Sequence, residues 1–189
     1  FIDNDIYMQI FNSSGSSILS EPALIIDNFF IDDNVKFIET DLNGNILIIY
    51  DSGDFSGTRV YAVLVDESGQ IIWNQRLSVE ENDQFAKGVV KTDTGFFVIW
   101  KDQRSGSADI YGQSIDFDGS LSGPDTGIAI AIQSNDQKSP SISYNDVNNN
   151  VVVCWEDFRN GLDFDIFCSE IDESTLEVSE IDLCLANGN

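Results

Sequence analysis

The sequence predicts an all-β fold made of repeated units of four antiparallel strands. Landmark aromatic residues recur at spacings of 54, 50 and 56 residues, and internal repetition on this scale is typical of stacked repeat architectures. The segments between the landmarks are short, rich in β-branched and aromatic residues, and bounded by Gly, Asn and Asp, as strands and turns are. No stretch combines a 3.6-residue period with helix caps. Each observation favours strands over helices.

The first landmark is a short segment that ends in an aromatic residue and occurs four times. Its copies are Asp5-Ile6-Tyr7, Arg59-Val60-Tyr61, Asp109-Ile110-Tyr111 and Asp165-Ile166-Phe167. A second landmark is an apolar run that ends in Tyr50, Trp100 or Trp155, and it precedes the next aromatic landmark by 11 or 12 residues. Because the landmarks share one period, they divide the chain into repeats 5–58, 59–108, 109–164 and a partial repeat 165–189.

Each full repeat is expected to contain four strands. In the second copy they span about 60–66, 71–78, 86–92 and 96–102. The fourth strands are continuous apolar runs, which need cover on both faces. Four-stranded sheets that stack face to face, as the blades of a β-propeller do, provide such cover. The alternative is a two-sheet β-sandwich, in which apolar and polar residues would alternate along each strand because one face of the sheet is exposed to solvent.

The length of the chain predicts a single domain over 1–189 that is incomplete by itself. About three and a half repeats of 50–56 residues fit into the 189 residues, and the last repeat is expected to be a hairpin of 164–171 and 177–185. A closed propeller needs about four blades, so the third and fourth strands of the last blade would be missing. An open sheet edge is a template for another strand. We therefore expect a longer chain or a second chain to complete the domain, and head-to-tail completion would build filaments.

Composition excludes several classes of function. The chain has 9 basic and 33 acidic residues and a formal net charge of −24, so neither nucleic acid nor an anionic membrane surface is an expected partner. No apolar run is long enough for membrane insertion. The absence of histidine excludes Ser-His-Asp and Cys-His catalysis. Two carboxylates could still hydrolyse glycosides, but no acid pair stands out, and we expect no enzyme.

The hairpin between successive repeats carries two opposite charges whose order is reversed in one copy. The pairs are Asp54–Arg59, Arg104–Asp109 and Arg159–Asp165. They contain three of the four arginines of the chain. Because both positions change sign together, the pattern predicts a salt bridge that closes each hairpin.

These hairpins resemble a repeat found in secreted and cell-surface bacterial proteins of propeller type. The segments that begin at Trp100-Lys101-Asp102-Gln103-Arg104 and at Trp155-Glu156-Asp157-Phe158-Arg159 are similar to the pattern W-x-D-x-R…D-I-Y-x-Q. The copy from Tyr50 to Tyr61 is degenerate. The resemblance covers nearly the whole chain. It implies an extracellular or cell-surface location and a binding or scaffolding role, and it carries no catalytic residues.

Acidic loops are the candidates for a cation site. Two groups are close in sequence: Asp116, Asp118 and Asp125, and Asp157, Asp163 and Asp165. Ca²⁺ binds several carboxylate and carbonyl oxygens, and it is the only cofactor considered. Neither group has the spacing of a twelve-residue calcium loop. Short acids also favour turns and a soluble surface, which is the preferred interpretation.

Two further residues are candidates for contact with sugars. Trp73 is an aromatic residue in a second strand, where the other copies have none, so an exposed ring could bind glycans. Packing between blades is the preferred interpretation of the same residue. Asn12 begins the sequence Asn12-Ser13-Ser14, which is a formal glycosylation sequon.

Three cysteines allow one intramolecular disulfide and one remaining thiol. Cys154 and Cys168 lie symmetrically about Gly161, which suits a pair across a hairpin. Cys168 could instead pair with Cys184, or all three could be buried thiols that act as small apolar residues.

Together these features predict a non-enzymatic extracellular protein with a structural or surface-interaction role. The expected partner is another copy of the chain or another surface protein. A carbohydrate- or calcium-binding propeller module of a larger secreted protein is the alternative.

Overall fold

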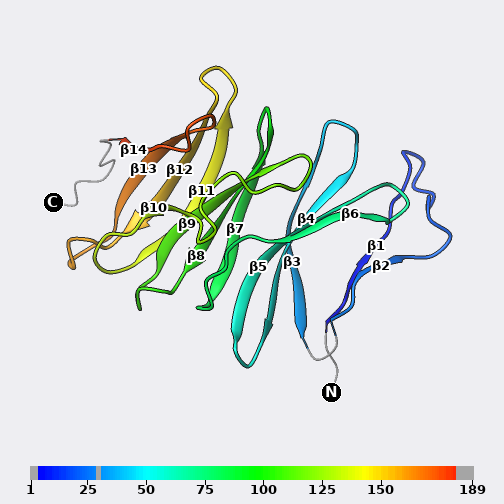
Figure 1. The fold of residues 1–189 in the computed structure, drawn as a ribbon, viewed down its shortest axis with the longest axis horizontal. Coiled ribbons are helices and arrows are strands. Elements are labelled where there is room, and N and C mark those ends of the chain that lie inside the picture. The colour runs from blue at the N-terminus through cyan, green and yellow to red at the C-terminus, as the bar shows by residue number, and fades with distance from the viewer. Residues whose placement is uncertain (1–3, 29–30, 182–189) are drawn as a thin grey trace.

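A computed structural model describes residues 4–28 and 31–181, which form fourteen β-strands and no helix (Figure 1). The prediction of an all-β fold is confirmed. Among these residues there is accordingly no helix that could cross a lipid bilayer. Neighbouring strands are antiparallel throughout.

The strands form three four-stranded sheets and one two-stranded sheet. The first sheet contains, in order, β3 (Asp32–Thr40), β4 (Ile46–Asp54), β5 (Gly57–Val65) and β6 (Ile71–Arg76). The second contains β7 (Gln84–Lys91), β8 (Gly95–Asp102), β9 (Asp109–Asp116) and β10 (Ile128–Ala131). The third contains β11 (Gln137–Asn145), β12 (Asn150–Asp157), β13 (Asp165–Asp172) and β14 (Val178–Ile181). The N-terminal pair consists of β1 (Ile6–Met8) and β2 (Ala23–Ile26).

The sheets are offset from the sequence repeats by two strands. Each four-stranded sheet joins the last two strands of one repeat to the first two strands of the next. The reason is that short hairpins connect β4 to β5, β8 to β9 and β12 to β13, and hairpin strands pair with each other. Segments 77–83 and 132–136 instead carry the chain from the last strand of one sheet to the first strand of the next.

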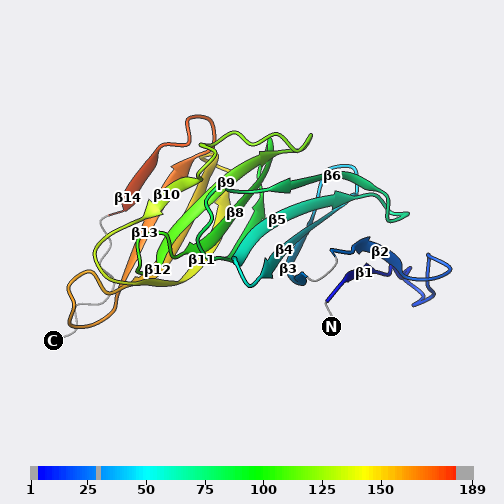
Figure 2. The same cartoon turned by 60° about the horizontal axis from the view of Figure 1, so that its bottom comes forward.

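The expected position of the half-blade is therefore wrong. Strands β13 and β14 complete the third sheet, and the two-stranded sheet stands at the opposite end of the molecule, in the N-terminal pair. Figures 1 and 2 show the sheets as successive layers from the N-terminal pair to the third sheet. The layers form an open series, and no sheet of the described residues closes on itself.

Three apolar layers hold the sheets together. In the second sheet, Phe96, Val98 and Trp100 pack toward the first sheet, whereas Phe97 and Ile99 pack toward the third. The corresponding strand of the first sheet likewise has one side in each of two clusters. Alternate side chains of a strand point to opposite faces. The continuous apolar runs of β4 and β8 are thus packed against a neighbouring sheet on both faces, as predicted.

One strand of each full sheet lies at its inner edge, and each of these strands contains a bulge. The inner strands are β3, β7 and β11, and β7 contacts both of the others. Their registers shift between Val35 and Phe37, between Ala86 and Gly88, and between Lys138 and Ser141. Bulges and lysines on an edge strand prevent pairing with foreign strands. Lys36 and Lys87 are the extra residues of the first two bulges.

Candidate functional site

The second sheet contains a buried carboxylate, that of Asp102, which binds the side chains of Trp100 and Arg104. We call these three residues the second-sheet Trp–Asp–Arg cluster. Asp102, at the end of β8, is fully buried. Its Oδ2 accepts hydrogen bonds from Trp100 Nε1 at 3.0 Å and from Gln84 Nε2 at 3.1 Å. Arg104 donates to both carboxylate oxygens, from Nε at 2.9 Å and from Nη2 at 2.6 Å. The guanidinium carbon of Arg104 lies 3.8 Å from the centre of the Tyr111 ring.

The third sheet repeats the same cluster. Asp157 is fully buried and accepts from Trp155 Nε1 at 2.8 Å and from Arg159 Nη2 at 2.8 Å. The guanidinium carbon of Arg159 lies 3.7 Å from the centre of the Phe167 ring. In both sheets the spacing W-x-D-x-R thus places an aspartate between an indole and a guanidinium, and the guanidinium over the aromatic residue of the next strand. Such charge-assisted bonds, two from the Arg104 guanidinium and one from that of Arg159, fix the geometry of a hairpin.

Hydrogen bonding keeps both buried aspartates charged. Burial alone would raise the pKa of Asp102, but the bonds from Arg104 and Trp100 outweigh it, and the pKa lies below its usual value. The same causes lower the pKa of Asp157. A buried carboxylate in this state is an anchor for its donors and not a proton donor or acceptor for a reaction. The clusters therefore serve the structure of the hairpins.

The first sheet lacks this cluster and has a different arrangement in its place. Tyr50 occupies the position of the tryptophan and stacks on Tyr61, with ring centres 5.3 Å apart. Ser52 occupies the position of the aspartate, and the acid is instead Asp33, directly opposite on β3. Asp33 is buried and bonded to Ser52 and to Asn28. The carboxylate has thus moved from the central strand to the inner one.

The predicted hairpin salt bridges have different partners in the structure. Arg104 and Arg159 each bind the aspartate two residues before them, not the aspartate across the hairpin. Arg59 binds Glu81 at 3.0 Å, and Glu81 also binds Arg76 at 3.1 Å. For Arg104 and Arg159 the prediction is wrong because the side chain folds back onto its own strand end, where the buried carboxylate and the aromatic ring are both within reach. For Arg59 it is wrong because Glu81, from the segment between β6 and β7, takes the place of Asp54.

The expected acidic partners lie near these hairpins in other roles. Asp54 accepts from the backbone and the hydroxyl of Ser56, at 2.7 and 2.6 Å. Asp165 accepts from Asn160 at 3.3 Å. Asp109 is buried, and burial raises its pKa although the charge of Arg104 opposes the shift. None of the three forms an ion pair in the part of the chain that the structure describes.

A further pair of aspartates connects neighbouring sheets and was missed in the sequence. Asp83, just before β7, accepts from the backbone N–H of Thr58 at 2.8 Å. Asp136, just before β11, accepts from the backbone N–H of Ala108 at 3.0 Å. Each side chain reaches back to the start of a strand in the preceding sheet. The signal was the tripeptide Asn-Asp-Gln, which occurs at 82–84 and again at 135–137.

Trp73 is packed between sheets and is not available as an exposed sugar platform. Its side chain is 9% exposed and belongs to the cluster between the first and second sheets. Its Nε1 donates to the carbonyl of Phe117 at 3.1 Å. Gly119, with φ of +91°, lies directly against the indole, and a Cβ there would come within 2.7 Å of the ring. The preferred interpretation is confirmed, and the proposed ligand role is wrong.

Most acidic residues of the two candidate cation groups have other hydrogen-bond partners in the structure, and calcium binding stays a prediction. No group of three or more potential ligands is found within residues 4–28 and 31–181. Asp157 is occupied by Arg159, Asp118 accepts from Ser120, and Asp163 accepts from Asn160. Asp125 is exposed in a loop. Most of these carboxylates therefore close their own turns.

One hollow contains part of the first acidic group. It has a volume of about 600 Å³ between the second and third sheets and is lined by Asp116, Asp118 and Glu173 among other residues. Glu173 accepts from the Tyr144 hydroxyl at 2.6 Å and from the Thr94 hydroxyl at 2.7 Å. The bond from Thr94 ties the second sheet to the third at the end opposite to the Trp–Asp–Arg clusters, and the bond from Tyr144 holds Glu173 in place within the third sheet.

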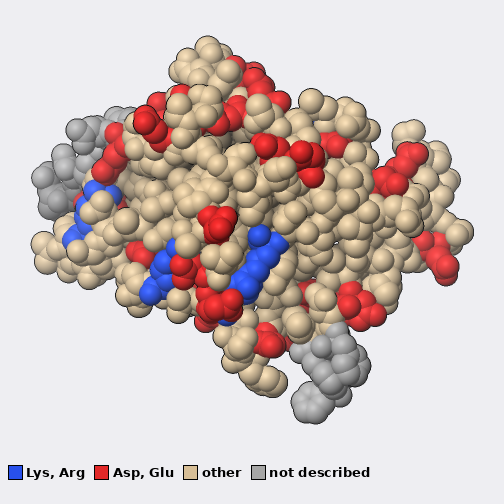
Figure 3. All heavy atoms as spheres, in the orientation of Figure 1, with Lys and Arg blue, Asp and Glu red and all other residues tan. Residues whose placement is uncertain are grey.

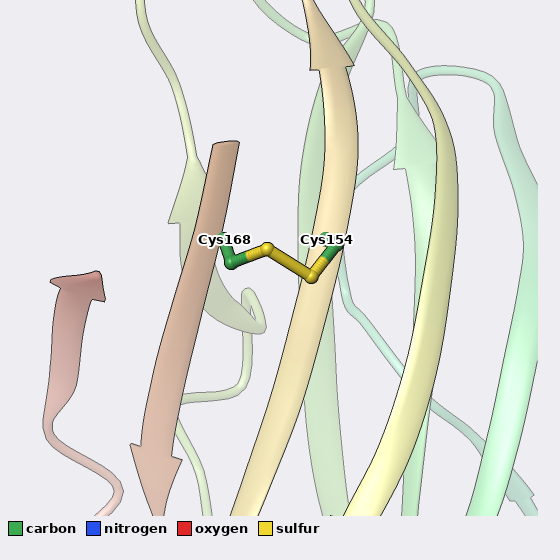
Figure 4. The surroundings of a disulfide bond; sticks show 2 residues. All are labelled: Cys154 and Cys168. Atoms are coloured by element: carbon green, nitrogen blue, oxygen red, sulfur yellow. A yellow bond between two sulfur atoms is a disulfide. The ribbon is translucent and has the colours of Figure 1, made fainter. Parts of the chain in front are cut away.

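Cys154 and Cys168 form a disulfide between β12 and β13 (Figure 4). The two residues are directly opposite each other in the register of the strands. The predicted hairpin pair is confirmed, and the alternative pairing of Cys168 with Cys184 is excluded. Cys184 itself lies outside the described residues. Disulfides are typical of oxidising compartments.

Asn12 lies in an exposed turn that its own side chain organises. Its Oδ1 accepts from the backbone N–H groups of Ser14 and Ser16, both at 3.0 Å, and from the Ser14 hydroxyl at 2.6 Å. Glycosylation at Asn12 stays a prediction.

Acidic side chains dominate the face shown in Figure 3, and the few basic groups there lie next to acidic ones. Comparison with models of known protein families and with curated proteins finds no match. The resemblance to secreted propeller-type repeats therefore stays a prediction, and the function has to be inferred from the molecule itself.

The buried carboxyl group of Asp33 is expected to reduce the stability of the fold when it is charged. Burial, together with the charges of Asp5 and Asp32, raises its pKa, although hydrogen bonds from Ser52 and Asn28 oppose the shift. A raised folded-state pKa stabilises the fold below the unfolded pKa, and this contribution is lost as the pH rises through the folded pKa. At neutral pH the charged side chain is therefore unfavourable. We expect Asp33→Asn to raise stability at pH 7 by about 1 kcal/mol, or roughly 2–4 °C in the unfolding midpoint.

Thermal unfolding at pH 7 and at pH 4 measures this effect. The gain should shrink as the pH falls from the folded pKa toward the ordinary aspartate pKa, since the wild-type side chain then becomes protonated first in the folded state and, below the ordinary pKa, in both states. Glu67→Gln is the control, because Glu67 is exposed in the turn after β5 and its charge is not among those that raise the pKa of Asp33. Equal gains from the two variants would mean that reduced net charge, and not burial, is responsible.

Proposed function

We propose that the chain is a non-enzymatic extracellular protein with a structural or surface-interaction role, which associates with a neighbouring chain through its N-terminal pair. The observation that carries this proposal is the unpaired edge of β1. In the three full sheets, the strands equivalent to β1 are β5, β9 and β13, and each pairs with an inner neighbour, β4, β8 or β12. Among the described residues β1 pairs only with β2.

The side chain of Tyr7 is consistent with a missing neighbour. Tyr111 and Phe167, at the equivalent positions, lie opposite a tryptophan and beneath an arginine. Tyr7 has neither and is 60% exposed. Leu24, which is paired with Tyr7 on β2, is 46% exposed. The edge of β1 can therefore pair with an antiparallel strand of a neighbouring chain, which would cover Tyr7 and Leu24.

The two ends of the stack are different, which favours a head-to-tail arrangement. Val151, Val153 and Trp155 of β12 face the second sheet. By alternation, Val152 and Cys154 face away from it, so the outer face of the third sheet contains the disulfide. A contact between this end and the N-terminal pair would join unlike surfaces, and such contacts build open chains of subunits.

The disulfide and the acidic surface support a location outside the cell. Cytosolic conditions keep most thiols reduced, whereas Cys154 and Cys168 are joined. A net charge of −24 keeps a surface soluble. The described hydrogen-bonded carboxylates hold turns and hairpins, which suits a structural role.

Light-scattering mass and negative-stain imaging test the proposal. We expect masses that are multiples of 21.0 kDa and that rise with protein concentration. Tyr7→Glu should weaken association at least tenfold, because it places a charge on the exposed receiving strand. Val147→Glu is the control, since Val147 is 85% exposed in a turn of the third sheet. A protein that stays monomeric at all concentrations would contradict the proposal.

A further inference from the structure

The lysines are arranged along the inner edge of the stack. Lys36, Lys87 and Lys138 are each 51 residues apart and lie at or beside the bulges of β3, β7 and β11. Protection of an edge strand accounts for such lysines in general. Lys36 also has a specific structural partner, because its Nζ lies 3.3 Å from the buried Asp51. The other two lysines have a different environment.

Lys87 and Lys138 line a hollow of about 320 Å³ between the second and third sheets, together with Lys101 from β8. Gln103, Asp136 and Ser139 are the other polar side chains of its wall, and Ala108 and Pro140 supply apolar surface. Ser139 belongs to the bulge of β11 and has φ of +50°. A non-glycine residue in this region is strained and is held there by its surroundings.

The charge of this hollow is opposite to that of the molecule. Three ammonium groups face one carboxylate, that of Asp136. Asp136 is already neutralised by Lys138, whose Nζ lies 2.8 Å from Oδ2, and its Oδ1 is bound to the backbone of Ala108. Lys87 and Lys101 form no ion pair within the described part of the chain. Lys101 Nζ also lies 4.6 Å from the centre of the Phe85 ring. In a chain with 33 acids, two lysines without an ion pair beside one hollow form a local positive site.

We propose that this hollow binds a sugar acid, with the carboxylate of the ligand beside Lys87 and Lys101. The volume lies near the lower end of the range of small-ligand sites and suits one monosaccharide. Ammonium groups bind a carboxylate as strongly hydrated point charges. The amide of Gln103, the hydroxyl of Ser139 and the carboxylate of Asp136 can bind sugar hydroxyls. Ala108 and Pro140 offer apolar contact to a sugar ring. A neutral sugar has no carboxylate for the two lysines, and a simple anion has no ring or hydroxyls for the other residues of the wall.

Titration with D-galacturonate, D-galactose and inorganic phosphate, followed by NMR chemical shifts of the labelled protein, tests the proposal. We expect saturable shifts near the hollow with galacturonate, and affinities at least tenfold weaker for galactose and for phosphate. Equal responses to galacturonate and phosphate would show charge attraction alone and would overturn the assignment. The absence of saturable binding to galacturonate would overturn it as well.

Variants of the lysines locate the site. The double variant Lys87→Gln/Lys101→Gln should reduce galacturonate affinity at least tenfold. Lys36→Gln removes one lysine of the same edge from outside the hollow and should leave the affinity within twofold. Unchanged thermal unfolding of the double variant establishes that its fold is retained. Because the titration can be repeated on the Tyr7→Glu protein, loss of sugar-acid binding is distinguishable from loss of association.

Discussion

Replacing Asp102 with Ala is expected to lower the free energy of unfolding by about 3–5 kcal/mol, the usual cost of removing one partner from a buried ion pair. The carboxylate is the common acceptor of Trp100, Gln84 and Arg104. Its removal leaves the Trp100 and Gln84 donors without their acceptor. It also leaves the Arg104 guanidinium with only the more distant Glu80 carboxylate, at 3.8 Å, and the carbonyl of Thr126. Urea denaturation followed by tryptophan fluorescence measures the effect, because Trp100 is fully buried in the folded state.

Two controls separate the cluster from a general effect of charge. Asp118→Ala removes an acid that only caps an exposed turn, and its effect on the free energy of unfolding should be much smaller. Asp102→Asn keeps the shape of the side chain but replaces one oxygen with a donor, and it should fall between the two. Similar losses for Asp102→Ala and Asp118→Ala would show that the cluster does not stabilise the sheet.

The acid limb of the stability curve provides a second readout for Asp102. Its pKa is lowered in the folded protein, so its contribution is complete above the unfolded aspartate pKa and is lost as the pH falls through the folded value. The wild-type protein should therefore lose stability on acidification more steeply than Asp102→Asn. A double-mutant cycle should show strong coupling of Arg104 to Asp102 and weak coupling of Arg104 to Asp109.

The strands could be predicted from the sequence because their signals are local. The apolar run 96–102 is β8 almost residue for residue. The start of β7 was placed two residues late, because Gln84 is polar and is buried only through its bond to Asp102. The grouping of strands into sheets was not predictable from the repeat, since a period does not specify which strand of the unit comes first. The direct hairpin from β12 to β13 contained that information.

The residues of the Trp–Asp–Arg clusters were evident as landmarks, but their contacts were not. The reversal of charge at Asp54 and Arg59 suggested a pair, whereas Arg59 binds Glu81 from a distant loop. A reversed sequence pattern cannot reveal a partner that lies outside the pattern. Trp73 presented the same difficulty, because its covering residue, Gly119, is 46 positions away and belongs to another sheet. Burial of an aromatic residue depends on such distant contacts.

Removal of the disulfide in the double variant Cys154→Ala/Cys168→Ala is expected to lower the free energy of unfolding by about 3 kcal/mol. The bond joins residues 14 positions apart, and closing a loop of this length reduces the entropy of the unfolded chain by that order. Urea denaturation of the wild type with and without reductant, beside the double variant, measures the effect. The double variant is its own control for the reductant, which should not change its stability any further.

Hydrogen exchange adds a spatial test of the same prediction. The disulfide joins two strands of the third sheet, and the first sheet shares no apolar cluster with that sheet. The double variant should therefore exchange faster in β12 and β13, while β4 and β5 keep most of their protection. Equally faster exchange in both sheets would mean that the stack opens as a single unit. In that case the effect of the disulfide would extend beyond the third sheet through the apolar contacts between sheets.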